Sequence, residues 1–332
     1  MRRTAALLLV TGLAFAGSSV AQDQGPYPRL PAPAVKSPPN TIAPDIPGVV
    51  AGGTEVRLIR DLFRSTEGPI AMPDGSLLFT EQDAGDGQLV RIDKDDKIST
   101  FLEMTNRTIG LAYDPKGRLI GAQSNQPRVA VLHPERRILA DSFEGVPLAY
   151  PNDLVIDRRG GIYFTDQLGG RFRPPPKERT RPILFYIRPE DGKLIKVSDE
   201  VDNPNGITLS PDEKVLYAAN GATIAAFDVQ PDGTLRNFRT FATLVKPRNA
   251  QGAEVQVGGD SMCVDEAGRV YVAAGGVQVF SPQGQHLGTI PTPLRAQAPA
   301  FAGPDKKTLY VVGAGAVYKV AMLTRGVQGR AK

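Results

Sequence analysis

The chain has 332 residues and a formal net charge of +4, from 39 Lys and Arg against 35 Asp and Glu. The basic side chains are scattered among acidic ones, without a basic stripe or interleaved aromatic residues, which argues against a nucleic-acid partner. The length fits one large domain or two ordinary ones. The single cysteine, Cys263, excludes an intramolecular disulfide, and its apolar neighbours predict an inert, buried thiol.

The first 21 residues have the pattern of a secretory signal peptide. Arg2 and Arg3 precede the apolar run 5–16, and Ser19-Val20-Ala21 has the small-x-small pattern of a cleavage site. We therefore expect residues 1–21 to be removed and the mature protein to be periplasmic or secreted, without a lipid anchor. No later run approaches the ~18 apolar residues of a membrane span, so no membrane partner is expected.

The segments that flank the main domain have little apolar character. Residues 22–48 are rich in Pro and are predicted to form an extended, largely unpacked leader. Residues 324–332 are predicted to form a flexible tail. The folded domain is expected to span residues 49–323.

Within that domain, a short apolar strand, a turn built on Asp, Pro or Gly, and a second apolar strand recur six times. Repetition at roughly 40–50 residues with strand–turn–strand units is typical of a β-propeller, whose blades are four-stranded antiparallel sheets. The sequence between the copies holds two further strands for most blades. The copies are IAMPDGSLLFTE from Ile70, LAYDPKGRLIGAQ from Leu111, LVIDRRGGIYFTD from Leu154, ITLSPDEKVLYAAN from Ile207, MCVDEAGRVYVAAG from Met262 and AFAGPDKKTLYVVG from Ala300.

The sixth copy is short of one strand. Only residues 315–323 follow its hairpin, while residues 54–62 form an apolar strand pattern ahead of the first copy. Pairing of these two segments would complete the sixth blade and close the ring. We therefore predict an all-β, six-bladed propeller closed by an N-terminal strand.

The inner strand of each blade lines the central channel, so side chains just before these strands should converge at one end of it. These positions are Glu67, Ile109, Asn152, Asn205, Asp260 and Ala298. Each polar one has an ordinary alternative, since Asn before Gly or Asp is common in turns and a loop acid is often solvated. Two carboxylates and two amides focused on one point would nevertheless be costly to bury without a cation.

The four polar side chains predict one divalent cation. Glu67, Asn152, Asn205 and Asp260 offer only oxygen, the ligand preferred by Ca²⁺ first and by Mg²⁺ or Mn²⁺ as alternatives. The only histidines, His133 and His286, fall on outer strands or turns, so Zn²⁺ fits less well. Four protein ligands leave room for water and a small-molecule substrate.

The segments TEGP, YPNDLVID, NPNGITLSPDEKVLYAAN and GGDSMCVDEAGRVYV resemble the SMP-30/gluconolactonase family. The resemblance covers about residues 48–319. It implies a six-bladed propeller with one catalytic divalent cation, usually Ca²⁺, held by Glu67, Asn152, Asn205 and Asp260. The acid at the position of Asp260 is the usual base or nucleophile of the family.

The chain departs from its relatives at Ile109 and at Ala298, where many have Asn. In some relatives an Arg at the position of Tyr150 contacts the sugar lactone, which makes Tyr150 a candidate substrate-binding residue. Asp153, expected to point off-axis, is a second candidate for substrate contact or for a turn, and Asp166 is expected to support the site from behind it.

The function predicted from these residues is metal-dependent hydrolysis of a lactone by a carboxylic ester hydrolase. Asp260 would act as general base or as nucleophile. The alternatives are a phosphotriesterase-like hydrolase and a non-enzymatic, Ca²⁺-stabilised binding module. The long loop 167–182, rich in Pro and basic residues, is either a solvated insertion or a lid over the site.

Overall fold

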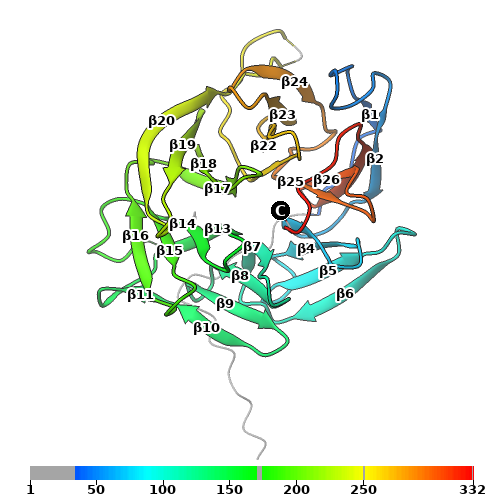
Figure 1. Cartoon of the computed structure of the whole chain (residues 1–332). Helices are drawn as coiled ribbons and strands as arrows, with labels where there is room; N and C mark the ends of the chain where they lie inside the picture. The colour runs from blue at the N-terminus through cyan, green and yellow to red at the C-terminus, as the bar shows by residue number, and fades with distance from the viewer. Residues whose placement is uncertain (1–33, 170–173, 250, 331) are drawn as a thin grey trace, which may run out of the picture.

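The computed structural model describes residues 34–169, 174–249, 251–330 and 332. These residues form strands and no helix, and six sheets surround a central axis (Figure 1). The predicted six-bladed β-propeller is confirmed. Over the same residues there is consequently no helix of the length and apolar character that a membrane crossing requires.

The first three blades are antiparallel four-stranded sheets with the strands in chain order from the axis outward. Blade 1 is β3 (Thr66–Ala71), β4 (Leu77–Glu81), β5 (Gln88–Ile92) and β6 (Ile98–Glu103). Blade 2 is β7 (Thr108–Tyr113), β8 (Leu119–Gln123), β9 (Arg128–His133) and β10 (Arg137–Ala140), followed by the small hairpin of β11 (Ser142–Phe143) and β12 (Val146–Pro147). Blade 3 is β13 (Tyr150–Ile156), β14 (Ile162–Gln167), β15 (Ile183–Ile187) and β16 (Leu194–Ser198).

The next two blades repeat this arrangement, and the sixth is assembled from both ends of the domain. Blade 4 is β17 (Pro204–Leu209), β18 (Val215–Asn220), β19 (Thr223–Val229) and β20 (Leu235–Thr243). Blade 5 is β21 (Met262–Val264), β22 (Val270–Ala273), β23 (Val277–Phe280) and β24 (His286–Ile290). Blade 6 contains β25 (Ala298–Ala302), β26 (Thr308–Gly313) and β27 (Ala316–Ala321), then β2 (Glu55–Arg60) and β1 (Thr41–Ile42).

Burial falls from the axis to the rim of each blade. Every residue of the inner strand β3 is buried, whereas the outer strand β6 has no buried residue. An inner strand lies between the channel and the next blades, so neither of its faces meets bulk water. This explains why the inner strands appear in the sequence as short continuous apolar runs rather than as an alternation.

Strand β2 closes the ring as predicted. It pairs antiparallel with β27, with Leu58 opposite Tyr318 and Arg57 opposite Lys319. Figure 1 shows the N-terminal strands beside the C-terminal strands of the same blade. The two ends of the domain are therefore held together by main-chain hydrogen bonds.

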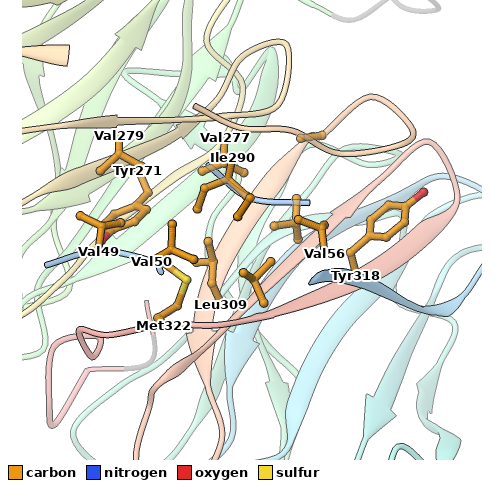
Figure 2. Close-up of a cluster of buried hydrophobic side chains, with 14 of the residues drawn as sticks. Val49, Val50, Val56, Tyr271, Val277, Val279, Ile290, Leu309, Tyr318 and Met322 are labelled. Atoms are coloured by element: carbon orange, nitrogen blue, oxygen red, sulfur yellow. The ribbon is translucent and has the colours of Figure 1, made fainter. Parts of the chain in front are cut away.

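The N-terminal boundary of the domain differs from the prediction. Strand β1 pairs with β2, and Ala43 and Ile46 are each 1% exposed, so packing begins ahead of residue 49. These side chains belong to a cluster between blades 5 and 6 that includes Val49, Val50 and Val56 (Figure 2). A few apolar residues in a Pro-rich segment are enough to fix it because they enter a core that already exists. The predicted signal peptide, residues 1–21, lies outside the described residues.

The predicted flexible tail is also different in the structure. Thr324 and Val327 are buried, and Gly326 forms a β-bridge with Asp265 of blade 5. The segment after β27 therefore runs back across the disc. In Figure 1 the C-terminus lies at the centre of the ring.

Truncation of the closing strand's core side chain should destabilise the domain. Val56 is fully buried on β2, so Val56→Ala should lower the free energy of unfolding by about 2 kcal/mol. Chemical denaturation of the wild type, Val56→Ala and the exposed-site control Arg60→Ala measures this. A Val56→Ala protein as stable as the Arg60→Ala control would contradict a stabilising role for the closing strand.

Candidate metal and catalytic site at the channel mouth

The predicted ligands lie at one end of the inner strands, here called the mouth. Glu67 is the second residue of β3, Asn152 the third of β13 and Asn205 the second of β17, and Asp260 stands two residues ahead of β21. The turns that follow the inner strands lie at the other end of the channel, here called the back face. Four blades therefore each bring one of these residues to the mouth.

Glu67 and Asp260 form a pair of buried carboxyl groups, 8% and 7% exposed. Burial raises the pKa of Glu67 well above its ordinary value, and the neighbouring Asp260 charge adds to this rise. Burial also raises the pKa of Asp260 to about 6, against the opposing effects of Arg295 and of a hydrogen bond with the Asn205 side chain. Two buried carboxylates whose charges act on each other are a suitable site for a cation.

The position of Asn205 depends on close packing of neighbouring inner strands. The backbone N–H of Gly206 donates to the Asp260 carbonyl at 3.2 Å, and the Thr165 hydroxyl donates to the Asn205 carbonyl at 2.9 Å. A Cβ at Gly206 would lie 2.5 Å from that Asp260 oxygen. Gly206 is thus required for the approach of blade 4 to blade 5, in addition to any local turn preference.

Asn152 and Asp153 separate into different environments. Asn152 is partly exposed. A Cβ added to Gly110 of blade 2 would lie 2.8 Å from the Asn152 carbonyl oxygen. Asp153 is 3% exposed, and its Oδ2 accepts hydrogen bonds from Ser261 Oγ at 2.8 Å and from the Ile207 N–H at 3.2 Å. Contrary to the expectation that Asp153 points off-axis, its carboxylate links three inner strands.

The sixth blade contributes Gln297 rather than the predicted Ala298. The Ser261 N–H donates to the Gln297 carbonyl at 2.9 Å, as the Gly206 N–H donates to Asp260, so Gln297 holds the equivalent place. Its Nε2 donates to Glu67 Oε1 at 2.5 Å. The prediction was wrong by one residue because it counted two places back from Ala300, whereas β25 already begins at Ala298.

A second mouth residue that the sequence did not indicate is Arg295. Its Nη2 donates to Asp260 Oδ2 at 2.7 Å, while the Arg295 side chain remains 69% exposed. It lies in the connection from β24 to β25, where only the three-dimensional path of the loop brings it to Asp260. The guanidinium is held by this pair while most of its side chain is in contact with solvent.

Asp166 anchors the segment that leads into β13. It is 1% exposed and accepts the N–H groups of Ala149 and Tyr150, the latter at 2.7 Å, and an ion pair from Arg179 at 2.8 Å. Burial raises its pKa to about 6 despite these partners. Asp166 thereby fixes the chain just ahead of Asn152, in keeping with a supporting role. Tyr150 itself is buried at the start of β13, and its substrate-binding role stays a prediction.

Part of the loop 167–182 can be compared with its two predicted roles. The Arg179 guanidinium is buried against Asp166 and lies 5.0 Å from the Phe185 ring centroid. Arg181 pairs with the exposed Asp202. Residues 170–173 lie outside the described part. Of the described arginines, Arg179 thus serves a buried ion pair and Arg181 an exposed one, and both predicted roles of the loop stay predictions.

The other candidate residues lie away from the mouth. Cys263 is 1% exposed, and burial raises its pKa, as expected of an inert thiol. His133 ends β9 and His286 begins β24, both outside the inner strands. Across the described residues, no three His, Cys, Asp or Glu side chains are grouped for metal binding. Any cation at the mouth would thus rely on amide oxygens beside Glu67 and Asp260.

A cavity of about 490 Å³ opens on the back face, formed by the turns after the inner strands and by residues 328–330. None of the predicted ligands lines it. The paired buried carboxylates are at the opposite end of the inner strands. We place the candidate chemistry at the mouth on the basis of those carboxylates.

The fold and the mouth together define a six-bladed propeller with buried acids and amides near one end of its inner strands. The family model described as SMP-30/Gluconolactonase/LRE-like region matches residues 65–315, and the chain belongs to this family. It is 25% identical over 312 residues to a gluconolactonase of Zymomonas mobilis, covering 86% of each chain. It is 31% identical over 147 residues to lactonase drp35 of Staphylococcus haemolyticus, covering 43% of this chain and 42% of the relative.

The solved structure of a gluconolactonase from Xanthomonas campestris is also similar. It superimposes with a TM-score of 0.73 at 27% identity, covering 89% of this chain and 99% of that one. The similarity extends over the whole ring and confirms the resemblance inferred from the sequence motifs.

The pKa shifts at the mouth predict how a cation changes stability with pH. A carboxyl group whose pKa is higher folded than unfolded binds its proton more tightly when folded, so the unfolding free energy falls as pH rises from about 4 through 6. A divalent cation bound there would replace those protons. We expect Ca²⁺ to raise the melting temperature at pH 7.5 more than at pH 5.

Thermal unfolding with and without Ca²⁺ at the two pH values measures this effect. Asp260→Asn removes one of the two titrating groups and should flatten the pH dependence. A Ca²⁺-induced shift of equal size at both pH values would contradict the assignment of Glu67 and Asp260 to the cation site.

Proposed function

We propose that this protein hydrolyses a lactone at the channel mouth, with a divalent cation held by Glu67, Asn152, Asn205 and Asp260. The observation that carries the proposal is the convergence of the buried pair Glu67 and Asp260 with the Asn205 amide at one mouth. The relatives named gluconolactonase and lactonase support a cyclic ester as the substrate class. A small-molecule substrate follows from the same comparisons.

The residues at the mouth fit a hard cation. Glu67 and Asp260 supply negative charge, and Asn152 and Asn205 supply neutral amide oxygens, the ligand types that Ca²⁺ and Mg²⁺ bind. Such a cation, when bound, polarises an ester carbonyl and stabilises the negative charge that develops on it. Ca²⁺ is the proposed ion, with Mg²⁺ or Mn²⁺ as substitutes and Zn²⁺ the weakest fit to an oxygen-only set.

The surrounding contacts prepare these side chains. Gln297 donates to one oxygen of Glu67, which holds the carboxylate in place. Arg295 pairs with Oδ2 of Asp260 from the solvent side and must move or share that oxygen when a cation arrives, since two positive groups on one carboxylate repel each other.

We assign the proton transfer to Asp260. Burial raises the pKa of Asp260 to about 6 before a cation binds, and a bound cation would favour the ionised form that accepts a proton from attacking water. The proton would later pass to the alkoxide that leaves when the ring ester opens. Direct attack by Asp260 as a nucleophile is the alternative route to the same product.

The assignment predicts separate losses of chemistry and of metal. Asp260→Asn keeps the side-chain size but removes the base, so lactone turnover should fall roughly 10²-fold or more. Chelator should abolish turnover, and Ca²⁺ should restore it. Asp202→Asn, an exposed acid paired with Arg181, is the matched control and should leave turnover unchanged.

Turnover and metal content should be measured together, with a panel of γ- and δ-lactones and one aryl phosphotriester. Wild-type turnover by metal-loaded Asp260→Asn would remove the catalytic role of this residue. Phosphotriester turnover without lactone turnover would replace the proposed substrate class. No turnover of any compound by metal-loaded wild type would favour a binding module.

We further propose that the protein is exported, on the basis of the signal-peptide pattern of residues 1–21. Expression of the full chain in a bacterium should yield a periplasmic or secreted protein whose first residue is Gln22. Deletion of residues 5–16 should retain the protein in the cytosol. Amino-terminal sequencing and cell fractionation measure both, and a cytosolic wild-type protein that keeps Met1 would overturn the proposal.

A further inference from the structure

The segment after β27 crosses the back face and enters the channel. The Gly326 N–H donates to the Lys306 carbonyl at 3.0 Å, and Lys306 Nζ donates to the Val327 carbonyl at 2.7 Å. The Glu266 N–H donates to the Arg325 carbonyl at 2.9 Å. These contacts tie the segment to the back-face turns of blades 5 and 6.

Arg330 then secures the segment to blade 4. Its Nη2 donates to the Leu209 carbonyl at 2.6 Å, its Nη1 donates to the Ser210 carbonyl at 3.2 Å, and its side chain is 8% exposed. Leu209 ends the inner strand β17 and Ser210 begins the turn after it, so Arg330 marks the back-face end of the channel. Lys332, two residues further on, lies close to the axis.

Lys332 reaches Asp153, which lies part-way along the inner strand β13. Its Nζ pairs with Asp153 Oδ2, and both side chains are 4% exposed. The other donors to this oxygen are Ser261, which follows Asp260, and Ile207, two residues after Asn205. Asp153 itself follows Asn152. The ammonium group therefore lies beneath three of the four proposed ligands.

This position gives Lys332 a definite electrostatic effect. Without a partner, Asp153 would be a third buried carboxylate next to Glu67 and Asp260, and an unpaired buried charge is strongly unfavourable. We propose that Lys332, brought through the channel by the C-terminal segment, locks Asp153 into an internal ion pair and so leaves only Glu67 and Asp260 as carboxylates for the cation. The part concerning the cation rests on the proposed function.

Removal of the Lys332 charge should raise the affinity for the cation, whereas loss of structure would lower it. Lys332→Met removes the positive charge and frees the Asp153 carboxylate, so Ca²⁺ should bind roughly tenfold or more tightly because of the added negative potential. A variant that only loosened the site would bind Ca²⁺ more weakly. Lys332→Arg keeps the charge and should bind as the wild type does.

The reverse change tests the same pair from the other side. Asp153→Asn leaves the Lys332 ammonium uncompensated, so Ca²⁺ should bind more weakly than in the wild type. The double variant Asp153→Asn/Lys332→Met has a neutral pair and should return toward wild-type affinity. Lys214→Met, at an exposed lysine on a back-face turn, is the control and should change nothing.

Isothermal titration with Ca²⁺ and thermal unfolding in chelator should be recorded for all of these proteins. Lys332→Met should melt lower by about 5–10 °C, and the double variant should recover part of the loss. Unchanged or weaker Ca²⁺ binding by folded Lys332→Met would overturn the inference. If that variant does not fold, equal affinity of Asp153→Asn and the double variant would overturn it.

The two proposals can fail separately. Wild-type protein that binds no divalent cation would overturn the proposed function and the cation part of this inference. The melting-temperature cycle in chelator would still decide the ion pair, since additive losses from Asp153→Asn and Lys332→Met would show that the two side chains do not interact.

Discussion

Buried negative charge is the constraint on which the centre of this propeller depends. Glu67, Asp153 and Asp260 come from three blades and are all less than one-tenth exposed. Each has a partner from a different direction: Gln297 within the ring, Lys332 from the back face and Arg295 from the solvent side. The partners differ in how firmly they are held. A carboxylate with a buried partner is fixed in an internal pair, whereas one with an exposed partner is open to a ligand.

The ring of inner strands makes this distribution of charge possible. Main-chain contacts between neighbouring blades, such as the Gly206 N–H on the Asp260 carbonyl, set the spacing of the side chains at the mouth. The absence of a Cβ at Gly206 permits that spacing. Asp166 and Arg179 fix the chain ahead of blade 3 in the same way. The arrangement of side chains at the mouth is therefore a property of the assembled ring rather than of any one motif.

Local patterns were sufficient to predict the blades, the closing strand and the acids and amides at the mouth, because strand periodicity and turn residues are encoded over a few positions. Gln297 was missed because β-strand register cannot be fixed to one residue from apolar character alone. Arg295 and Lys332 reach the site through loop and tail paths that no local pattern records. Ala43 and Val327 lie in segments of low apolar content, whose packing depends on cores supplied by other parts of the chain.

The pairing of β2 with β27 also has a consequence for biosynthesis. Arg57 emerges early from the ribosome, but its partner Lys319 is made only near the end of the chain. Until then the edges of β2 and of the unfinished ring have unpaired main-chain groups that other strands could join. Folding of such a topology is slow, since the largest loop must close last. Chaperone protection during synthesis should therefore matter more for this chain than its final stability would indicate.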